Sequence, residues 1–212
     1  MFEVDRPAIV LGSTQREDVL DVAACAAAGI EVVRRRSGGG VVLVEPGALV
    51  WFDVVVPTRV LHDVGVGDDI RASMVWLGSH IAGALGGEAA PTERAPARRA
   101  AMGSGGAAPS AADGVTVHRG TMACTGWCPL VCFAGVGPGE VLAGRDKLVG
   151  ISQRRTRAGA RFQCAVHVEW SPDRLVPLLA GPLPDTPLPR VATLPADAAR
   201  ALPAAVAQTL RS

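Results

Sequence analysis

The sequence predicts one α+β domain over residues 1–212, with most of its strands paired antiparallel. Its 212 residues, 49% hydrophobic and 19% charged, describe a globular chain long enough to bury a substantial core. Short apolar runs are separated by only a few turn residues, and such connections favour antiparallel hairpins over crossover units. Stretches with helical periodicity precede, interrupt and follow these runs, so helices are expected alongside the strands.

The chain is expected to begin with a buried strand over residues 7–12. Ser13 or Thr14 then caps a predicted helix over about residues 16–28, which has acidic residues in its first turn and ends at Gly29. The inner face of this helix is expected to carry Val19, Leu20, Val22, Ala23 and Ala26.

The remaining elements follow from apolar periodicity and turn residues. Strands are expected at residues 30–33, 41–44, 49–56, 115–118, 130–133, 140–142, 148–152 and 161–169. An amphipathic pattern predicts a helix over residues 68–85, and a short helix starts at Ser171. Residues 86–113, rich in Ala, Pro, Gly and Ser, are expected to form a mobile surface loop. A C-terminal helical tail is expected within residues 183–212, helical from about 196 to 210.

Composition and charge exclude several classes of function. A net charge of +1 and an aromatic content of 4% argue against a nucleic-acid partner. No apolar run reaches membrane-spanning length, and the N-terminus lacks the pattern of a secretory signal. Five cysteines, an odd number, are most simply free thiols in a reducing compartment. We therefore expect a cytoplasmic protein with no membrane partner.

The stretch from residue 32 to residue 47 joins two apolar runs through three arginines, a serine and three glycines. It predicts a strand, a tight loop and a second strand. Adjacent glycines let a backbone approach a ligand closely, and their N–H groups can converge on an anion. Guanidinium groups beside such a loop suit phosphate or carboxylate. The candidate binding residues are Arg35, Arg36, Ser37, Gly38, Gly39 and Gly40. The alternative is a flexible hairpin turn with a solvated basic edge.

A second stretch, residues 139–155, contains Lys147, the only lysine of the chain against 20 arginines (21 minus 1). It is expected between a turn and a strand, on a comparatively rigid base. A compact ammonium there suits a phosphate or an acyl carbonyl on which charge develops. The alternative is one more exposed lysine, but a single lysine among so many arginines indicates a task that arginine does not perform.

Together the two stretches resemble the biotin/lipoate A/B protein ligase superfamily and, within it, the lipoate–protein ligase A branch. The family's Arg-Arg-x-Ser-Gly-Gly-Gly pattern falls on residues 34–40, and its first apolar strand falls on residues 7–15. Its Lys-apolar-x-Gly-x-x-Gln pattern falls on Lys147, Gly150 and Gln153. The resemblance covers about residues 7–180, with the motifs in the family's order.

This resemblance implies a single catalytic domain with a mainly antiparallel sheet flanked by helices, related to the class II synthetase fold. It implies that the loop at residues 35–40 wraps an acyl-adenylate made from ATP (with Mg) and lipoate or octanoate. It also implies that Lys147 contacts the acyl carbonyl and the phosphate. The acyl group then passes to a lysine on a lipoyl-type carrier domain of a 2-oxoacid dehydrogenase or glycine-cleavage protein.

The chain departs from the family pattern at several places. Many relatives carry a histidine where this chain has Val44, and a His-Gly pair where it has Gln163 and Cys164. An opening helix and a separate C-terminal domain found in relatives are not recognised here. Either an accessory subunit supplies the missing part, or the chain does not use ATP.

A second hypothesis of function concerns Cys132, which precedes Lys147 in a Cys-Phe segment. Octanoyltransferases of the same superfamily carry their cysteine nucleophile in a similar segment before the lysine. A thiolate near an ammonium is activated and accepts an acyl group from a thioester. The alternative role of Cys132 is a small hydrophobe in a strand. Cys124, Cys128 and Cys132 recur every four residues, but this spacing fits no common zinc pattern, and no metal site is expected.

Three hypotheses of function therefore stand. The first is an acyl-protein ligase that depends on ATP, and the second is an octanoyl or lipoyl transferase that acts through a Cys132 thioester. The third is a non-catalytic module that binds an acyl cofactor and has lost the family's imidazoles.

Overall fold

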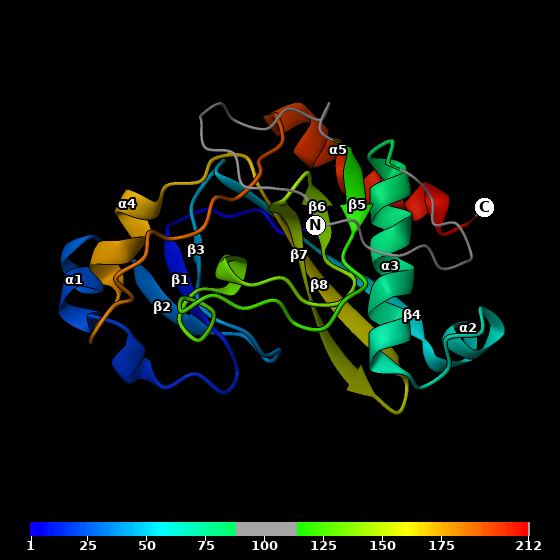
Figure 1. Ribbon diagram of the computed structural model, residues 1–212, viewed down its shortest axis with the longest axis horizontal. Coiled ribbons are helices and arrows are strands. Elements are labelled where there is room, and N and C mark those ends of the chain that lie inside the picture. The colour runs from blue at the N-terminus through cyan, green and yellow to red at the C-terminus, as the bar shows by residue number, and fades with distance from the viewer. Residues whose placement is uncertain (88–113, 212) are drawn as a thin grey trace.

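The computed structural model of the protein describes residues 1–87 and 114–211, which form two sheets with helices around them (Figure 1). One sheet has three strands in the order β2-β1-β3, and the other has five in the order β4-β8-β7-β6-β5. The surface loop expected over residues 86–113 lies outside the described residues, apart from its first two glycines. In the part of the chain that is described, no helix combines the length and the apolar character needed to cross a bilayer.

The three-stranded sheet is built around β1 (Ala8–Leu11), whose four residues are all buried. β2 (Glu31–Arg34) pairs with it in parallel, and β3 (Val42–Val44) pairs with its other edge antiparallel. The chain between β1 and β2 carries α1 (Val22–Ala27), which gives it the length that a parallel crossover needs. The glycine stretch therefore forms the loop between β2 and β3 around the end of β1, as predicted, and the alternative of a hairpin turn is not formed.

The single helix expected over residues 16–28 is also wrong, because the chain forms a short 3-10 turn, Glu17–Val19, before α1. Leu20 between them has extended backbone angles, and Asp21 caps α1 in place of Ser13 or Thr14. Of the expected inner face, Leu20 is buried but Val22 is 53% exposed, and the buried residue of α1 is a cysteine. Because alanines give little contrast between the faces of a helix, the apolar pattern does not show which residues of α1 face the core.

The five-stranded sheet is antiparallel throughout, as predicted. Its strands are β4 (Leu49–Pro57), β5 (Val115–Val117), β6 (Val141–Ala143), β7 (Asp146–Thr156) and β8 (Gly159–His167). The expected hairpin of residues 41–44 with 49–56 is not formed, since β3 and β4 belong to different sheets. β4 pairs along all nine of its residues with β8, a match that the three-residue β3 does not offer.

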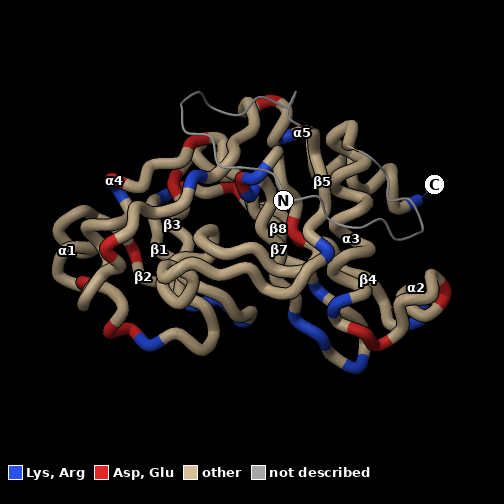
Figure 2. Tube along the Cα trace, viewed as in Figure 1, with Lys and Arg blue, Asp and Glu red and all other residues tan. Residues whose placement is uncertain are grey.

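Helices α3 (Ile70–Ala84) and α5 (Ala196–Thr209) pack against each other beside the five-stranded sheet (Figure 1). Both match predicted helices. Leu77, Ile81 and Leu202 from these helices share one buried cluster with Phe162 of β8. A further helix, α2 (Thr58–Asp63), was not predicted, and α4 (Pro172–Leu175) lies beside the three-stranded sheet. Basic positions gather at the turn between β7 and β8 (Figure 2), where Arg154, Arg155 and Arg157 lie.

Between the two sheets runs the segment 118–140, which has little regular structure. Residues 130–133, expected as a strand, form instead a bridge at Val131 and a 3-10 turn, Cys132–Ala134. The bridge joins Val131 to Val41, with hydrogen bonds from Val41 N to Leu130 O (2.7 Å) and from Cys132 N to Val41 O (3.0 Å). The segment is thereby fixed to the end of the three-stranded sheet and carries Cys132 to the glycine stretch.

Candidate active site

A cavity of about 680 Å³ lies where the glycine stretch, the N-terminus of α3, segment 118–140 and β7 meet. Its lining includes Gly38, Gly39 and Gly40 on one side and Lys147 and Gln153 on the other. The two stretches that the sequence singled out, about 100 residues apart, therefore face the same space. Cys132 also lines this cavity, whereas Arg35, Arg36, Ser37 and Gly150 do not.

The glycine loop is packed so closely that side chains do not fit at two of its contacts. A Cβ atom at Gly40 would lie 2.6 Å from the backbone N of Cys132, and one at Gly12 would lie 1.9 Å from the carbonyl O of Gly39. Gly39 itself has φ of 100°, a region that side chains disfavour. Around Gly38, by contrast, a Cβ would meet nothing within 4 Å. The loop thus has a locked half at Gly39 and Gly40 and an open half at Gly38.

Arg35 holds this loop from behind. Its side chain is buried, with Nη2 donating to the carbonyl oxygens of Gly38 and Gly40 (both 2.8 Å) and Nη1 to Val10 O (3.2 Å). Burial lowers the pKa of the guanidinium, while the neighbouring Cys132 sulfur acts in the opposite direction. Arg36 is exposed. Of the two arginines expected to bind phosphate, one therefore fixes the loop, and the other is exposed and does not line the cavity.

Ser37 is buried under the loop and joins it to the five-stranded sheet. Its hydroxyl donates to Gln163 Oε1 (2.7 Å) and accepts from Ser152 Oγ (2.9 Å). Gln163 occupies the position where the resemblance leads one to expect a histidine. Its amide here has a structural partner, which ties β8 to the glycine loop.

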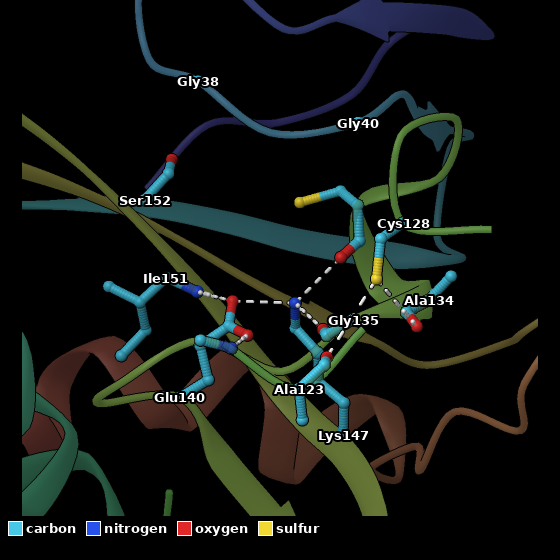
Figure 3. Close-up of polar contacts among 12 residues, drawn as sticks. Gly38, Gly40, Ala123, Cys128, Ala134, Gly135, Glu140, Lys147, Ile151 and Ser152 are labelled. Carbon is cyan, nitrogen blue, oxygen red and sulfur yellow. Dashed lines mark hydrogen bonds and ion pairs between the residues drawn. The ribbon is translucent and has the colours of Figure 1, made fainter. Parts of the chain in front are cut away.

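Lys147 extends from the start of β7 into the interior and is 3% exposed. Its Nζ lies 2.7 Å from Glu140 Oε1 and donates to the carbonyl oxygens of Cys132 and Gly135 at 3.0 Å each (Figure 3). An ammonium has three donors, and all three have acceptors here. The Phe133 ring centroid lies 4.8 Å from Nζ and adds a cation–π contact. The chain's single lysine is thus a fixed, buried cation and not an exposed one.

Glu140, which the sequence analysis did not single out, completes this arrangement. Besides the lysine, its carboxylate accepts hydrogen bonds from Gly137 N (2.7 Å) and Ile151 N (3.1 Å) (Figure 3). A buried ion pair is stable only when its remaining hydrogen-bonding positions are filled, and these contacts fill them. The signal in the sequence that could have found this pair is an acidic residue seven positions before Lys147, across the turn between β6 and β7.

Gly150 and Gln153 shape the surroundings of the lysine. A Cβ atom at Gly150 would lie 3.0 Å from the Phe133 ring and 3.2 Å from Lys147 Cε, so glycine leaves room for the lysine stem. Gln153 donates through Nε2 to Ser73 Oγ of α3 at 3.0 Å. Its Oε1 is buried beside the cavity and has no hydrogen-bond partner among residues 1–87 and 114–211. This oxygen is available to a donor on a bound molecule.

His167 lies behind the lysine and is also buried. Burial, together with the charge of Lys147, lowers its pKa to about 4, although Nδ1 lies 3.2 Å from Glu169 O. Its ring stacks edge-on against Phe133 and Trp170, with centroids 4.5 and 4.9 Å away. A neutral imidazole at pH 7 follows, so His167 supports the wall behind the lysine as a core residue.

Three of the five cysteines, Cys124, Cys128 and Cys132, line the cavity. The other two, Cys25 and Cys164, are buried in the hydrophobic cores. Among residues 1–87 and 114–211, no group of three or more His, Cys, Asp or Glu side chains is placed to hold a metal ion.

Comparison with known proteins gives this fold and cavity a family. The profile of the lipoyl protein ligase A/B catalytic domain matches residues 1–187, and the chain belongs to this family. No curated protein matches the chain significantly.

Solved structures share the fold at low sequence identity. A crystal structure of lipoate-protein ligase A bound with ATP has a TM-score of 0.64 and 18% identity, over 97% of this chain and 70% of that one. A putative lipoate protein ligase from T. acidophilum with bound lipoic acid has a TM-score of 0.60 and 18% identity, with the same coverage. A bi-partite lipoate protein ligase from Thermoplasma acidophilum, reported with its E2 lipoyl domain, has a TM-score of 0.61 and 17% identity, over 97% and 68%.

Proposed function

We propose that the protein is a lipoate–protein ligase-like enzyme that activates lipoate or octanoate with ATP and transfers the acyl group to a carrier lysine. The observation that carries this proposal is the shared cavity, lined on one side by Gly38–Gly40 and on the other by Lys147. Family membership and the likeness to a ligase bound with ATP and to one bound with lipoic acid support it. Mg would accompany ATP as the usual counterion of its phosphates.

The proposed roles follow from the geometry of each group. Gly38 and Gly39 are exposed, and within the described part of the chain their amide N–H groups donate to no other residue. These amides are free to hold a phosphate, as backbone nests do. The proposed role of Lys147 is that of a fixed cation that stabilises charge developing on the acyl carbonyl and phosphate, and a direct hydrogen bond to the substrate requires one of its three present acceptors to be replaced. Gln153 Oε1 is available to a donor on the substrate.

The proposed acceptor is a lysine on a lipoyl-type carrier domain of a 2-oxoacid dehydrogenase or glycine-cleavage protein. The archaeal relative described with its E2 lipoyl domain supports this class of partner. That relative is bi-partite, which also supports a second chain as an accessory subunit here. Ligase assays are therefore designed with and without such a subunit.

The test is pyrophosphate release on incubation with ATP and lipoate, followed by mass analysis of a carrier domain. We expect Lys147→Ala to lose release by at least a hundredfold. Because this variant leaves Glu140 unpaired, Lys147→Met combined with Glu140→Gln, which keeps the cavity wall neutral, is measured beside it, and circular dichroism verifies that both fold. No release by the wild type with any medium-chain acid, with an accessory subunit present, would reject the ligase proposal.

One observation favours a second candidate, acyl transfer through Cys132. The Cys132 sulfur lines the cavity beside the Arg35 guanidinium, and a Cβ on Gly39 would lie 3.3 Å from it. In this reaction Cys132 Sγ attacks the carbonyl of an acyl thioester, the donor thiol leaves with the proton, and the carrier lysine amine then displaces Sγ. A hydroxylamine-sensitive mass increase after exposure to octanoyl-carrier protein without ATP is expected. A Cys132→Ala variant with full activity would eliminate this candidate.

A further inference from the structure

The end of β7 and the turn after it carry three arginines that have no part in either proposed reaction (Figure 2). Because side chains alternate along a strand, Arg154 and Arg155 point to opposite faces of the sheet. Arg155 faces α3, where it donates to Gly67 O (3.0 Å) and to Ser73 Oγ (3.2 Å). Arg154 is exposed on the other face, and Arg157 is exposed in the turn. Neither of these two side chains forms an ion pair or a hydrogen bond with another described residue.

A second arginine lies directly opposite Arg154 on the neighbouring strand. Arg161 of β8 is its partner in the antiparallel register, and the Arg161 side chain is 48% exposed. Like charges directly opposite each other destabilise a sheet. Arg161 forms an ion pair with Asp53, whereas Arg154 pairs with no carboxylate of the described residues. An anion supplied from outside the protein would therefore relieve the repulsion between the two arginines.

This face of the sheet continues to the cavity. Ser152, which lines the cavity, precedes Arg154 by two positions, a distance of about 7 Å along the strand. The Ser152 hydroxyl lies below the glycine loop (Figure 3) and bonds to Ser37 Oγ at 2.9 Å. On either side of Ser37 in the sequence are Arg36, which is exposed, and Gly38, which is exposed and lines the cavity. The exposed arginines of the loop and of the sheet therefore border the cavity on the same side.

The same face has a hollow of about 180 Å³, which is lined by Arg154, Arg161, Val55 and Pro57 among others. Val55 lies opposite Arg161 on β4 and is 69% exposed. A positively charged border around an exposed apolar side chain is complementary to an acidic protein surface that also offers an apolar contact. We call the four exposed arginines on this side of the cavity the basic face: Arg36, Arg154, Arg157 and Arg161.

We infer that the basic face docks an acidic surface of the carrier domain that presents the acceptor lysine. The inference rests on the proposed function, because that function brings a carrier to this cavity. A lysine holds its amine on a four-carbon stem, so the carrier surface around it has to contact the protein beside the cavity. On the side of α3 the cavity is bordered by Asp69 and Arg71, whose charges are opposite. Of these two borders, the basic face is the one with an excess of positive charge, and it favours an acidic partner.

The experiment measures association of the full chain with a labelled, unlipoylated E2 lipoyl domain by stopped-flow fluorescence. ATP and acid are absent, so the result does not depend on ligase activity. Exposed charges at the edge of an interface act mainly on the rate of encounter. We therefore expect Arg154→Glu combined with Arg157→Glu to lower the association rate constant about tenfold at low ionic strength. The difference should disappear in 1 M salt, where the Debye length is about 3 Å.

Two controls make the result specific to the basic face. Arg145→Glu reverses an exposed arginine in the turn at the opposite end of β7, about 30 Å away, and should associate like the wild type. A lipoyl domain whose acidic residues nearest the acceptor lysine are changed to lysine should prefer the double variant to the wild type. Circular dichroism and melting temperatures verify that all variants fold.

Pyrophosphate release from ATP and lipoate without a carrier keeps the two proposals apart. The double variant should release pyrophosphate like the wild type and show a raised KM for the carrier alone. Absent association, or equal association of the wild type and the double variant, would overturn the docking proposal and leave the ligase proposal standing. A raised KM for ATP would assign the arginines to nucleotide phosphates, and a dimer that the double variant abolishes would assign them to a second copy; either result overturns carrier docking. Association without release by the wild type rejects only the ligase.

Discussion

The cavity has a buried cation on each side, and the two are stabilised in different ways. Arg35, on the side of the three-stranded sheet, is surrounded by neutral carbonyl groups of its own loop and of β1. Lys147, on the side of the five-stranded sheet, has a carboxylate 2.7 Å away and carbonyls besides. The arginine fork fixes a backbone, whereas the lysine is itself fixed as a point charge facing a cavity. One cation therefore holds the loop, and the other is itself held at the cavity wall.

The most severe test of this contrast removes the carboxylate. Glu140→Ala leaves the Lys147 ammonium buried without its counterion, and breaking such a pair costs about 3–5 kcal/mol. Urea unfolding measures the loss. Asp197→Ala, which removes one half of the exposed ion pair with Arg200, serves as the control and should change stability by less than about 0.5 kcal/mol. Equal effects of the two changes would mean that the buried pair does not hold Lys147 in place.

A second test uses pH, because the pKa of His167 beside the lysine is lowered to about 4. The unfolded chain takes up this proton near pH 6.5 and the folded protein only near pH 4. The free energy of unfolding is therefore unaffected by His167 above about pH 6.5. It decreases as the pH falls toward 4, by up to about 3 kcal/mol. Unfolding free energies at pH 7.5 and pH 5 report it, and His167→Gln should flatten the profile, whereas the exposed His62→Gln should not.

On the arginine side, the loop itself is the target. Gly40→Ala places a methyl group 2.6 Å from the backbone N of Cys132. Because a backbone moves less readily than a side chain, this change should lower the free energy of unfolding by about 2 kcal/mol. Gly38→Ala, with open space around its Cβ, is the matched control two residues away and should cost less than about 0.5 kcal/mol. Thermal unfolding distinguishes them, and indistinguishable melting temperatures would argue against the locked half of the loop.

The smallest expected effect comes from Arg35→Lys, which keeps the charge but loses the fork whose Nη2 reaches Gly38 and Gly40 while Nη1 reaches Val10. The loss of one carbonyl contact should cost about 1 kcal/mol. If the loop binds ATP as proposed, its looser backbone should raise KM for ATP more than it lowers kcat. A variant in which kcat alone falls would place Arg35 in the chemistry and end the contrast between the two cations.

Much of the site was predictable because its residue types are unusual. Three adjacent glycines and a single lysine among arginines stand out in a sequence, and the structure places both at one cavity. Glu140 did not stand out in the sequence. Its importance depends on its contacts with Lys147 across a turn and with two backbone amides, and composition does not predict such contacts. Local patterns also gave most strands and the helices α3 and α5.

The sequence did not predict which strands pair with one another. The length of apolar runs showed where β2, β3 and β4 lie, but not that β1 inserts between the first two or that β4 joins another sheet. Such choices depend on long-range partners, of which β8 is the example for β4. The role expected for Arg35 in holding phosphate likewise depended on which carbonyls surround it.

The bridge between Val41 and Val131 has one more consequence, for the size of molecule that the protein accepts. Backbone hydrogen bonds between residues 41 and 130–132 set the separation of the glycine loop from the segment that carries Cys132. Trimming side chains deepens such a cavity without moving its walls apart. Widening the cavity for a bulkier ligand therefore calls for changing chain length near residues 129–131, where the spacing is set.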